Sequence, residues 1–162
     1  MATENTNLSN YDSKTLPDAT HLRFGIVVSE WNPTITEGLL KDAVGALLDC
    51  GVVESNIKTI HVPGSFELPL AAQFLLESKN VDAVICLGSV IQGETKHFDY
   101  VCQTTSNGIK DVSLKYNKAV IFGVLTDNTM QQAIDRSGGK HGNKGVEASI
   151  TAIKMVSLMK NL

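Results

Sequence analysis

The sequence contains few of the residues that mark several common protein classes. Only three of its 162 residues are cysteines, Cys50, Cys86 and Cys102, and none of them forms a CxxC pair. An odd, widely spaced set of cysteines argues against both a disulfide framework and a cysteine zinc site. We therefore expect reduced thiols in a cytoplasmic protein.

A basic excess and a long apolar run are also missing. The formal net charge is -3, whereas proteins that bind nucleic acids normally carry a basic patch or stripe. No apolar run reaches the roughly 18 residues that a membrane-spanning helix needs. Residues 1–20 have neither the basic start nor the apolar centre of a secretory signal. We expect no nucleic-acid partner and no membrane association.

What the chain does contain is a regular alternation of apolar segments. Its 43% hydrophobic and 19% charged residues suit one globular domain. The polar residues 1–20 predict a flexible N-terminal arm, and residues 21–162 predict a single α/β domain.

Apolar and β-branched runs predict strands, and amphipathic periodicity predicts the helices between them. The predicted strands are 22–28, 57–62, 81–87 and 119–125, and the predicted helices are 34–50, 66–79, 98–116, 130–137 and 145–160. Short links between alternating strands and helices favour right-handed crossovers and a parallel sheet. The fold class is therefore a three-layer α/β/α sandwich with a four-stranded parallel sheet, of the flavodoxin-like type.

The most informative segment, residues 88–100, follows the third predicted strand. In open α/β sheets, ligands bind at the carboxyl ends of the strands. Two glycines in this segment allow close approach of the backbone to a ligand. The amides of Glu94 and Thr95 can bind an anion at a helix start, and His97 can exchange protons near neutral pH. An anion site beside a proton carrier favours catalysis.

Three further candidates lie in other loops at the strand ends. Trp31 is surrounded by polar residues, which favours stacking on a planar ligand over a place in the core. Glu67 lies in a first helical turn, where a carboxylate stabilises the helix dipole as readily as it binds a substrate. Arg136 begins a segment with three positive charges and no carboxylate up to Gly145, so a solvated basic turn and a phosphate site both remain open. No P-loop, dinucleotide motif or metal-ligand cluster is present in the sequence.

Five sequence blocks carry a resemblance to a known family. They are FGIVV with WN between 24 and 32, VPGSFELP at 62–69, LGSVI, GET and HFDYVC between 87 and 102, FGVLT at 122–126, and AIDR with GNKG between 133 and 145. In this order and at these separations they resemble the 6,7-dimethyl-8-ribityllumazine synthase family of riboflavin biosynthesis, from about residue 22 to the C-terminus.

The resemblance implies an activity and a role for each matching residue. The reaction would join 5-amino-6-(D-ribitylamino)uracil to 3,4-dihydroxy-2-butanone 4-phosphate with release of phosphate, and would require no metal or organic cofactor. His97 would be the catalytic proton carrier, and the Glu94 and Thr95 amides with Arg136 would hold the phosphate. The ribitylaminouracil would be bound by Trp31, Ser65, Phe66, Glu67, Ser89, Val90, Ile91 and Phe122.

The resemblance also implies an assembly. In this family the site lies between adjacent subunits of a pentamer, so Phe122 and Arg136 would come from the neighbouring subunit. The short turn at 137–142 is similar to that of members that form icosahedral shells of twelve pentamers, which we expect here. Riboflavin synthase is a possible partner of such a shell.

Two other functions stay open at this point. Trp31 stands where phenylalanine is frequent in the family, and Glu94 stands where a small residue is usual. The added negative charge of Glu94 hints at a shell protein that binds lumazines or flavins without turnover. A phosphate-regulated flavodoxin-like module is the third candidate, but no aspartate stands at the end of the first strand to accept a phosphoryl group.

Overall fold

Four parallel strands form the central sheet of the computed structural model, which describes residues 9–78 and 80–162. The strands are β1 (Phe24–Ser29), β2 (Ile57–Val62), β3 (Ala83–Ile91) and β4 (Ala119–Asp127). Their spatial order is β2-β1-β3-β4, and every neighbouring pair is parallel. The predicted four-stranded parallel sheet is therefore confirmed.

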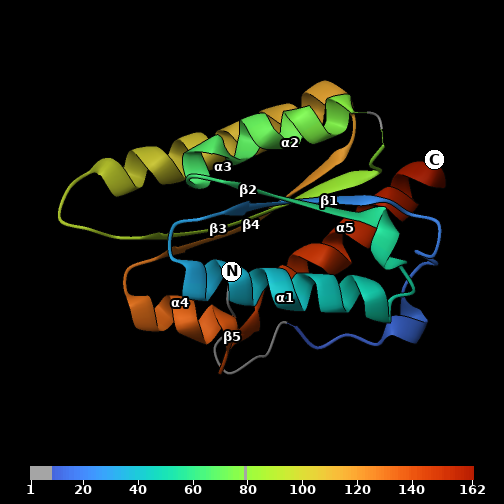
Figure 1. The fold of residues 1–162 in the computed structure, drawn as a ribbon, viewed down its shortest axis with the longest axis horizontal. Helices are drawn as coiled ribbons and strands as arrows, with labels where there is room; N and C mark the ends of the chain where they lie inside the picture. Colours follow the sequence, from blue (N-terminus) through green and yellow to red (C-terminus); the bar gives the residue numbers. More distant parts are fainter. Residues whose placement is uncertain (1–8, 79) are drawn as a thin grey trace.

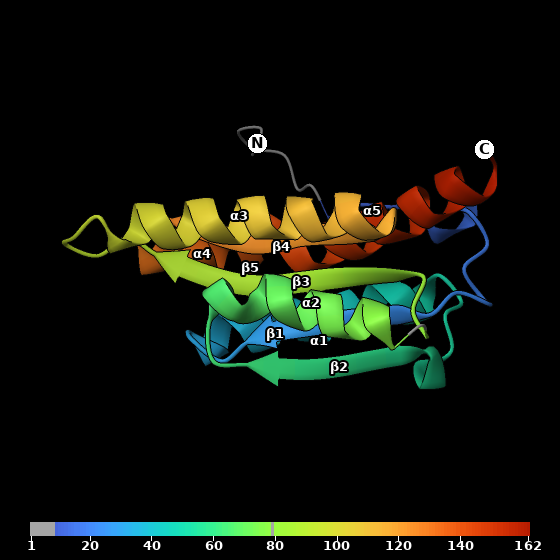
Figure 2. The same ribbon diagram turned by 90° about the horizontal axis from the view of Figure 1, so that it is seen from above.

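Five α-helices cover the sheet on both faces within the described ranges. They are α1 (Pro33–Asp49), α2 (Leu68–Glu77), α3 (His97–Tyr116), α4 (Met130–Arg136) and α5 (Lys144–Lys160). Helices α2 and α3 lie on one face, and α1, α4 and α5 lie on the other (Figures 1 and 2). This arrangement confirms the three-layer sandwich.

The core divides into one apolar cluster on each face of the sheet. Phe24, Ile26 and Val28 of β1 pack in the cluster under α1 and α5, whereas Val27 packs in the cluster under α2 and α3. Every residue of β1 is buried, as expected for a central parallel strand covered on both sides. The sheet is therefore a rigid platform for the loops at its carboxyl edge.

Strand β3 is longer than the sequence predicted. The prediction ended this strand at Leu87, but the strand continues to Ile91. Gly88, which seemed to open a loop, lies within the strand because its missing side chain leaves room for helix packing. A Cβ on Gly88 would lie 2.6 Å from the Ser65 Oγ and 3.1 Å from the Leu68 Cδ1. The missing side chain of Gly88 therefore serves close packing within the chain.

Short elements at other boundaries also differ from the predictions. The predicted helix 66–79 begins as a 3-10 turn, η3 (Ser65–Glu67), before α2. A small antiparallel hairpin, β5 (Ser137–Gly139) with β6 (Gly142–Asn143), follows α4 and was not predicted. Its strands of three and two residues are too short to leave an alternating pattern in the sequence.

The segment before β1 contacts the domain where the structure describes it. Residues 1–8 lie outside the described residues, and η1 (Ser13–Thr15) is the first element. The Ser9 Oγ donates a hydrogen bond to the Asn143 carbonyl at 3.1 Å, and Ala19 is fully buried. The division of the chain at residue 20 stays a prediction.

Cys50, Cys86 and Cys102 are all free thiols. No helix in the described ranges combines the length and the apolar character needed to cross a membrane.

Candidate active site

A cavity of about 520 Å³ opens at the carboxyl edge of the sheet. Residues from the ends of β1, β2 and β3 and from the start of α3 surround it. Eight of the predicted site residues line this cavity: Trp31, Ser65, Phe66, Glu67, Ser89, Val90, Ile91 and His97. Asn32, Gly64 and Val101 line it too, and the sequence analysis did not select them.

Trp31 lies at the rim of the cavity and not in the core. Its side chain is 71% exposed, so it is available for stacking on a planar ring. The next residue, Asn32, has a φ of 58°, a left-handed conformation that asparagine tolerates better than most residues. The Asn32 Nδ2 donates to the Ser89 carbonyl oxygen at 3.1 Å. This bond ties the loop that carries Trp31 to β3.

The turn η3 places three predicted residues, Ser65, Phe66 and Glu67, in the wall of the cavity. The Ser65 carbonyl accepts a hydrogen bond from the Thr105 Oγ1 at 3.1 Å, which fixes the turn against α3. A Cβ on Gly64 would lie 3.1 Å from the Glu67 Oε2 and 3.4 Å from the Trp31 Cδ1. The glycine therefore leaves room for Trp31 and Glu67 to flank it.

The Glu67 carboxylate does not cap the helix that it precedes. It makes no side-chain capping bond at the start of α2. Within residues 9–78 and 80–162, no hydrogen-bond or ion-pair partner of this carboxylate is found. A carboxylate without a partner at a cavity wall is able to accept hydrogen bonds from ligand hydroxyls, and its place in the first turn also suits the helix dipole.

The end of β3 presents polar groups to the cavity. Pairing of β3 with β1 ends at Leu87, whereas pairing with β4 continues to Ile91. One backbone edge of residues 88–91 is therefore not covered by β1. The hydroxyls of Ser65 and Ser89 are buried and have no hydrogen-bond partner within the described ranges. Buried polar groups are normally satisfied in proteins, so these groups suit a ligand with its own donors and acceptors.

His97 is the first residue of α3, and the loop before it is exposed. Its backbone N–H donates to the Thr95 Oγ1 at 3.3 Å. The loop that contains Glu94 and Thr95 projects from one end of the molecule (Figures 1 and 2), and neither residue lines the cavity. A Cβ on Gly93 would meet no atom within 4 Å, so packing within this chain does not require glycine there.

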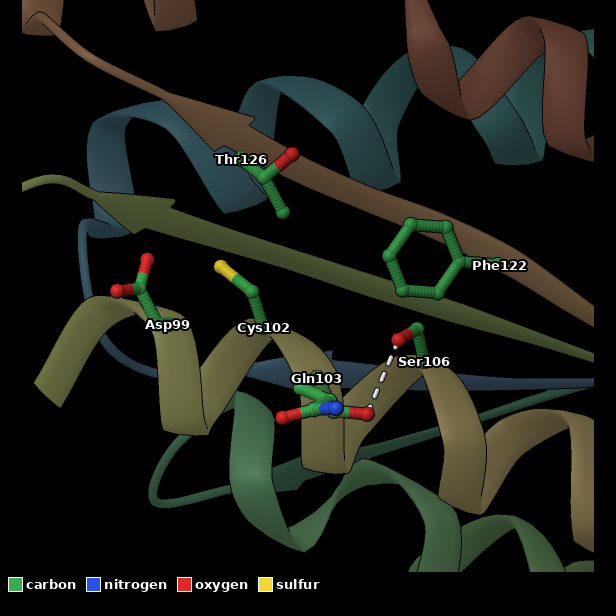
Figure 3. Close-up of a pocket in the computed structure, with 6 residues that line it drawn as sticks. All are labelled: Asp99, Cys102, Gln103, Ser106, Phe122 and Thr126. Atoms are coloured by element: carbon green, nitrogen blue, oxygen red, sulfur yellow. Dashed lines mark hydrogen bonds between the residues drawn. The ribbon is translucent and has the colours of Figure 1, made fainter. Parts of the chain in front are cut away.

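Phe122 lies in a second cavity, of about 490 Å³, between α3 and β4. Figure 3 shows its ring on β4 facing polar side chains of α3. Within this chain it does not reach the first cavity. In the same place, burial and the nearby Asp99 raise the pKa of the Cys102 thiol, which disfavours a thiolate nucleophile at neutral pH.

Arg136 lies at the end of α4 and is held by a carboxylate that the sequence analysis missed. Its Nη2 donates to the Glu147 Oε1 at 2.8 Å, and its Nη1 donates to the His141 carbonyl at 2.9 Å. The Lys144 Nζ lies 3.0 Å from the Glu147 Oε2. These two bonds of Arg136 use two of the five N–H groups of a guanidinium. Glu147 follows the basic segment by only two residues, and the helical spacing of Lys144 and Glu147 was the available signal.

The four remaining predicted residues thus lie away from the first cavity. Glu94 and Thr95 are in the projecting loop, Phe122 is in the second cavity, and Arg136 is beyond the end of β4. No group of three or more His, Cys, Asp or Glu side chains in the described ranges is placed to hold a metal ion.

Comparison with known proteins gives one consistent result. The sequence model of the 6,7-dimethyl-8-ribityllumazine synthase family matches residues 21–160. A protein of that name from Flavobacterium johnsoniae is 62% identical over 155 residues, which cover 96% of this chain and 82% of the relative. Proteins of the same name from Flavobacterium psychrophilum and Cytophaga hutchinsonii are each 56% identical, over 98% and 97% of this chain and 84% and 98% of their own lengths.

Proposed function

The chain belongs to the 6,7-dimethyl-8-ribityllumazine synthase family of riboflavin biosynthesis enzymes, and we propose how its residues carry out that reaction. The substrates are 5-amino-6-(D-ribitylamino)uracil and 3,4-dihydroxy-2-butanone 4-phosphate, and phosphate is released. The observation that carries the proposal is the single cavity of about 520 Å³ around Trp31, Glu67 and His97. It joins a stacking surface, a carboxylate and a proton carrier.

The ribitylaminouracil occupies the first cavity. Trp31 stacks on the pyrimidine ring, since its indole is exposed at the rim. The uncovered edge of β3 at Ser89, Val90 and Ile91 offers backbone groups to the polar edge of that ring. Ser65, Phe66 and Glu67 of η3 line the ribityl chain, with the Glu67 carboxylate accepting from its hydroxyls.

The chemistry needs few catalytic groups. An imine forms between the 5-amino group and the ketone, phosphate leaves, and the ring closes to the lumazine. His97 moves protons during imine formation and phosphate loss, because a histidine can accept and donate protons near neutral pH. Much of the rate comes from holding the two substrates in a reactive geometry.

The phosphate lies beside the loop before α3. Glu94 and Thr95 directly precede Lys96, the N-cap of the long helix α3, and their backbone amides bind the phosphate where the helix dipole favours an anion. Arg136 completes this subsite with N–H groups that Glu147 and His141 do not use.

A neighbouring copy of the chain supplies Phe122 and Arg136. Two different apolar surfaces are present on one subunit. One is a ridge of Phe66, Leu70 and Phe74, each more than half exposed. The other is a groove along α3 and β4 that contains Phe122. Unlike surfaces that bind each other form head-to-tail contacts, which close into rings when the rotation allows it.

We propose a pentamer as the ring and a shell of twelve pentamers as the assembly. The support is the family membership together with the short hairpin at 137–143. The proposal includes the cytoplasm as the location and riboflavin synthase as a possible partner inside such a shell.

The decisive test is turnover of the two purified substrates, followed by lumazine absorbance. Acceleration over the spontaneous reaction supports the enzyme. Quenching of Trp31 fluorescence by lumazine without any acceleration would instead establish a binding protein that lacks the chemistry. Light scattering during the same experiment measures the particle and tests the pentamer and the shell.

A further inference from the structure

Asn143 is a buried junction between three parts of the chain. It is 2% exposed, and its Nδ2 donates to the Gly38 carbonyl at 3.1 Å and to the Asp42 Oδ2 at 2.8 Å on α1. Its Oδ1 accepts from the Gly145 N–H at 2.8 Å and so caps α5. The main chain of Asn143 contacts the third part, which is the segment that contains Ser9.

Ser9 holds both main-chain polar groups of Asn143. The Ser9 Oγ donates to the Asn143 carbonyl at 3.1 Å and accepts from the Asn143 N–H. These bonds join residues that are 134 positions apart. The Ser9 hydroxyl thus links the segment before β1 to the residue that precedes α5.

Asn143 stands directly before the charged first turn of α5. Lys144 and Glu147 follow it, and the Glu147 carboxylate holds the Arg136 guanidinium. This turn has little room to move, because a Cβ on Gly145 would lie 2.1 Å from the Leu39 carbonyl oxygen. Asn143 and Gly145 together therefore fix the position from which Glu147 reaches Arg136.

The segment before β1 is fixed at more than one point. Tyr11 lies beside Asp49 at the end of α1, and burial together with this carboxylate raises the pKa of the Tyr11 hydroxyl to about 12. Between this segment and α5 lies a cavity of about 390 Å³, whose wall includes Tyr11, Asp12 and Glu147. The segment 9–16 therefore lies along the same helix turn that orients Arg136.

We propose that residues 9–16 form a strap that orients Arg136 for phosphate binding, with Ser9 and Asn143 as positioning residues. The strap acts through the Asn143 main chain on the first turn of α5, and through Glu147 on the guanidinium. This inference rests on the proposed role of Arg136 in binding the phosphate substrate. It gives the segment before β1 a function in one subsite only, because neither Ser9 nor Asn143 lines the cavity of Trp31.

The test compares Ser9→Ala with two variants in the full-length protein. Ser9→Thr keeps the hydroxyl, and Thr15→Val removes a hydroxyl whose bond stays within the segment, to the Asp12 carbonyl. Ser9→Ala should raise the Kd for inorganic phosphate in calorimetry and the KM for the butanone phosphate by about three- to tenfold, the range of one hydrogen bond. The KM for the uracil substrate should stay within about twofold, and both control variants should behave like the unchanged protein.

A second measurement tests the route through Glu147. In a Glu147→Gln background, Ser9→Ala should add little further loss of phosphate binding, because the transmitting carboxylate is already gone. Full additivity of the two losses, equal changes in both KM values, or unchanged phosphate binding in Ser9→Ala would overturn the strap. Absence of turnover in the unchanged protein would overturn the proposed function instead, and the calorimetric measurement would still test the strap.

Discussion

The Asn32 side-chain amide donates to the Ser89 carbonyl at 3.1 Å and thereby joins the loop after β1 to the end of β3. The two residues stand 57 positions apart in the sequence. Asn32 holds a left-handed backbone immediately before α1 begins at Pro33. One residue therefore sets the path of the loop, anchors it to the neighbouring strand end, and presents Trp31 at the rim of the cavity.

Asn32→Gly separates the backbone role of this residue from its hydrogen bond. Glycine adopts the left-handed conformation without cost, so the fold should be retained, but the bond to Ser89 is lost. One neutral hydrogen bond contributes about 1 kcal/mol, which corresponds to a rise of about fivefold in the KM for the uracil substrate. Steady-state kinetics with each substrate varied in turn measure this. A rise of equal size for the butanone phosphate would contradict the local role.

Replacement of Trp31 should affect binding and leave the fold unchanged. The exposed indole contributes little to the core, so Trp31→Ala should leave the Tm within about 2 °C, as substitutions on the surface generally do. The loss of stacking should raise the KM for the uracil substrate by about two- to tenfold, since aromatic stacking contributes about 0.5–1.5 kcal/mol. Trp31→Phe is the matched control and should keep most of the affinity. A Trp31→Ala variant with normal KM would remove the stacking role.

His97→Ala should give a slower enzyme that still accelerates the reaction. General acid–base catalysis contributes about 10²-fold or more, but substrate positioning remains in the variant. The kcat should fall and both KM values should change little. His61→Ala is the control, because His61 is also partly exposed and pairs with Glu37 on α1 at 2.9 Å, away from the cavity lining. Equal loss in both variants would mean that His97 has no specific part in the chemistry.

The centre of the sheet could be predicted because β1 and most of β3 are buried on both faces and therefore appear as apolar runs between helical patterns. The residues around the first cavity could be predicted because they follow directly after those strands. The end of β3 could not be predicted, because a glycine such as Gly88 usually weakens a strand. Gly88 is accommodated there because Ser65 and Leu68, which are distant in the sequence, pack against it. The ion pair between Arg136 and Glu147 could not be predicted either, because the hairpin between them brings the two residues together.

Arg136→Ser should change one substrate far more than the other. Loss of the guanidinium removes charge-assisted bonds to the phosphate, so the apparent KM for the butanone phosphate should rise by about tenfold or more. The KM for the uracil substrate should stay within about twofold. Arg136→Lys keeps the charge without the planar fork and should recover part of the affinity. Equal effects on both substrates would remove Arg136 from the phosphate subsite.

Asp127 at the end of β4 is expected to make stability fall as the pH rises. Burial raises the pKa of this carboxyl above the usual 3.8, and the nearby Arg136 offsets only part of that rise. Its Oδ2 has no hydrogen-bond partner within the described ranges. Because the folded state binds the proton more tightly than the unfolded state, stability is lost as the pH rises from about 3.8 through the raised pKa. Asp127→Asn cannot ionise and should raise the Tm at pH 7.

The critical measurement is the difference in Tm between Asp127→Asn and the unchanged protein at several pH values. The difference in Tm between Asp127→Asn and the unchanged protein should shrink as the pH falls toward 4, where the native carboxyl becomes protonated and resembles the amide. Asp111→Asn is the control, because Asp111 is exposed and pairs with its neighbour Lys110 at 2.8 Å, so its removal should leave the Tm nearly unchanged at every pH. A lower Tm for Asp127→Asn at pH 7 would show that attraction to Arg136 outweighs the burial of the carboxylate.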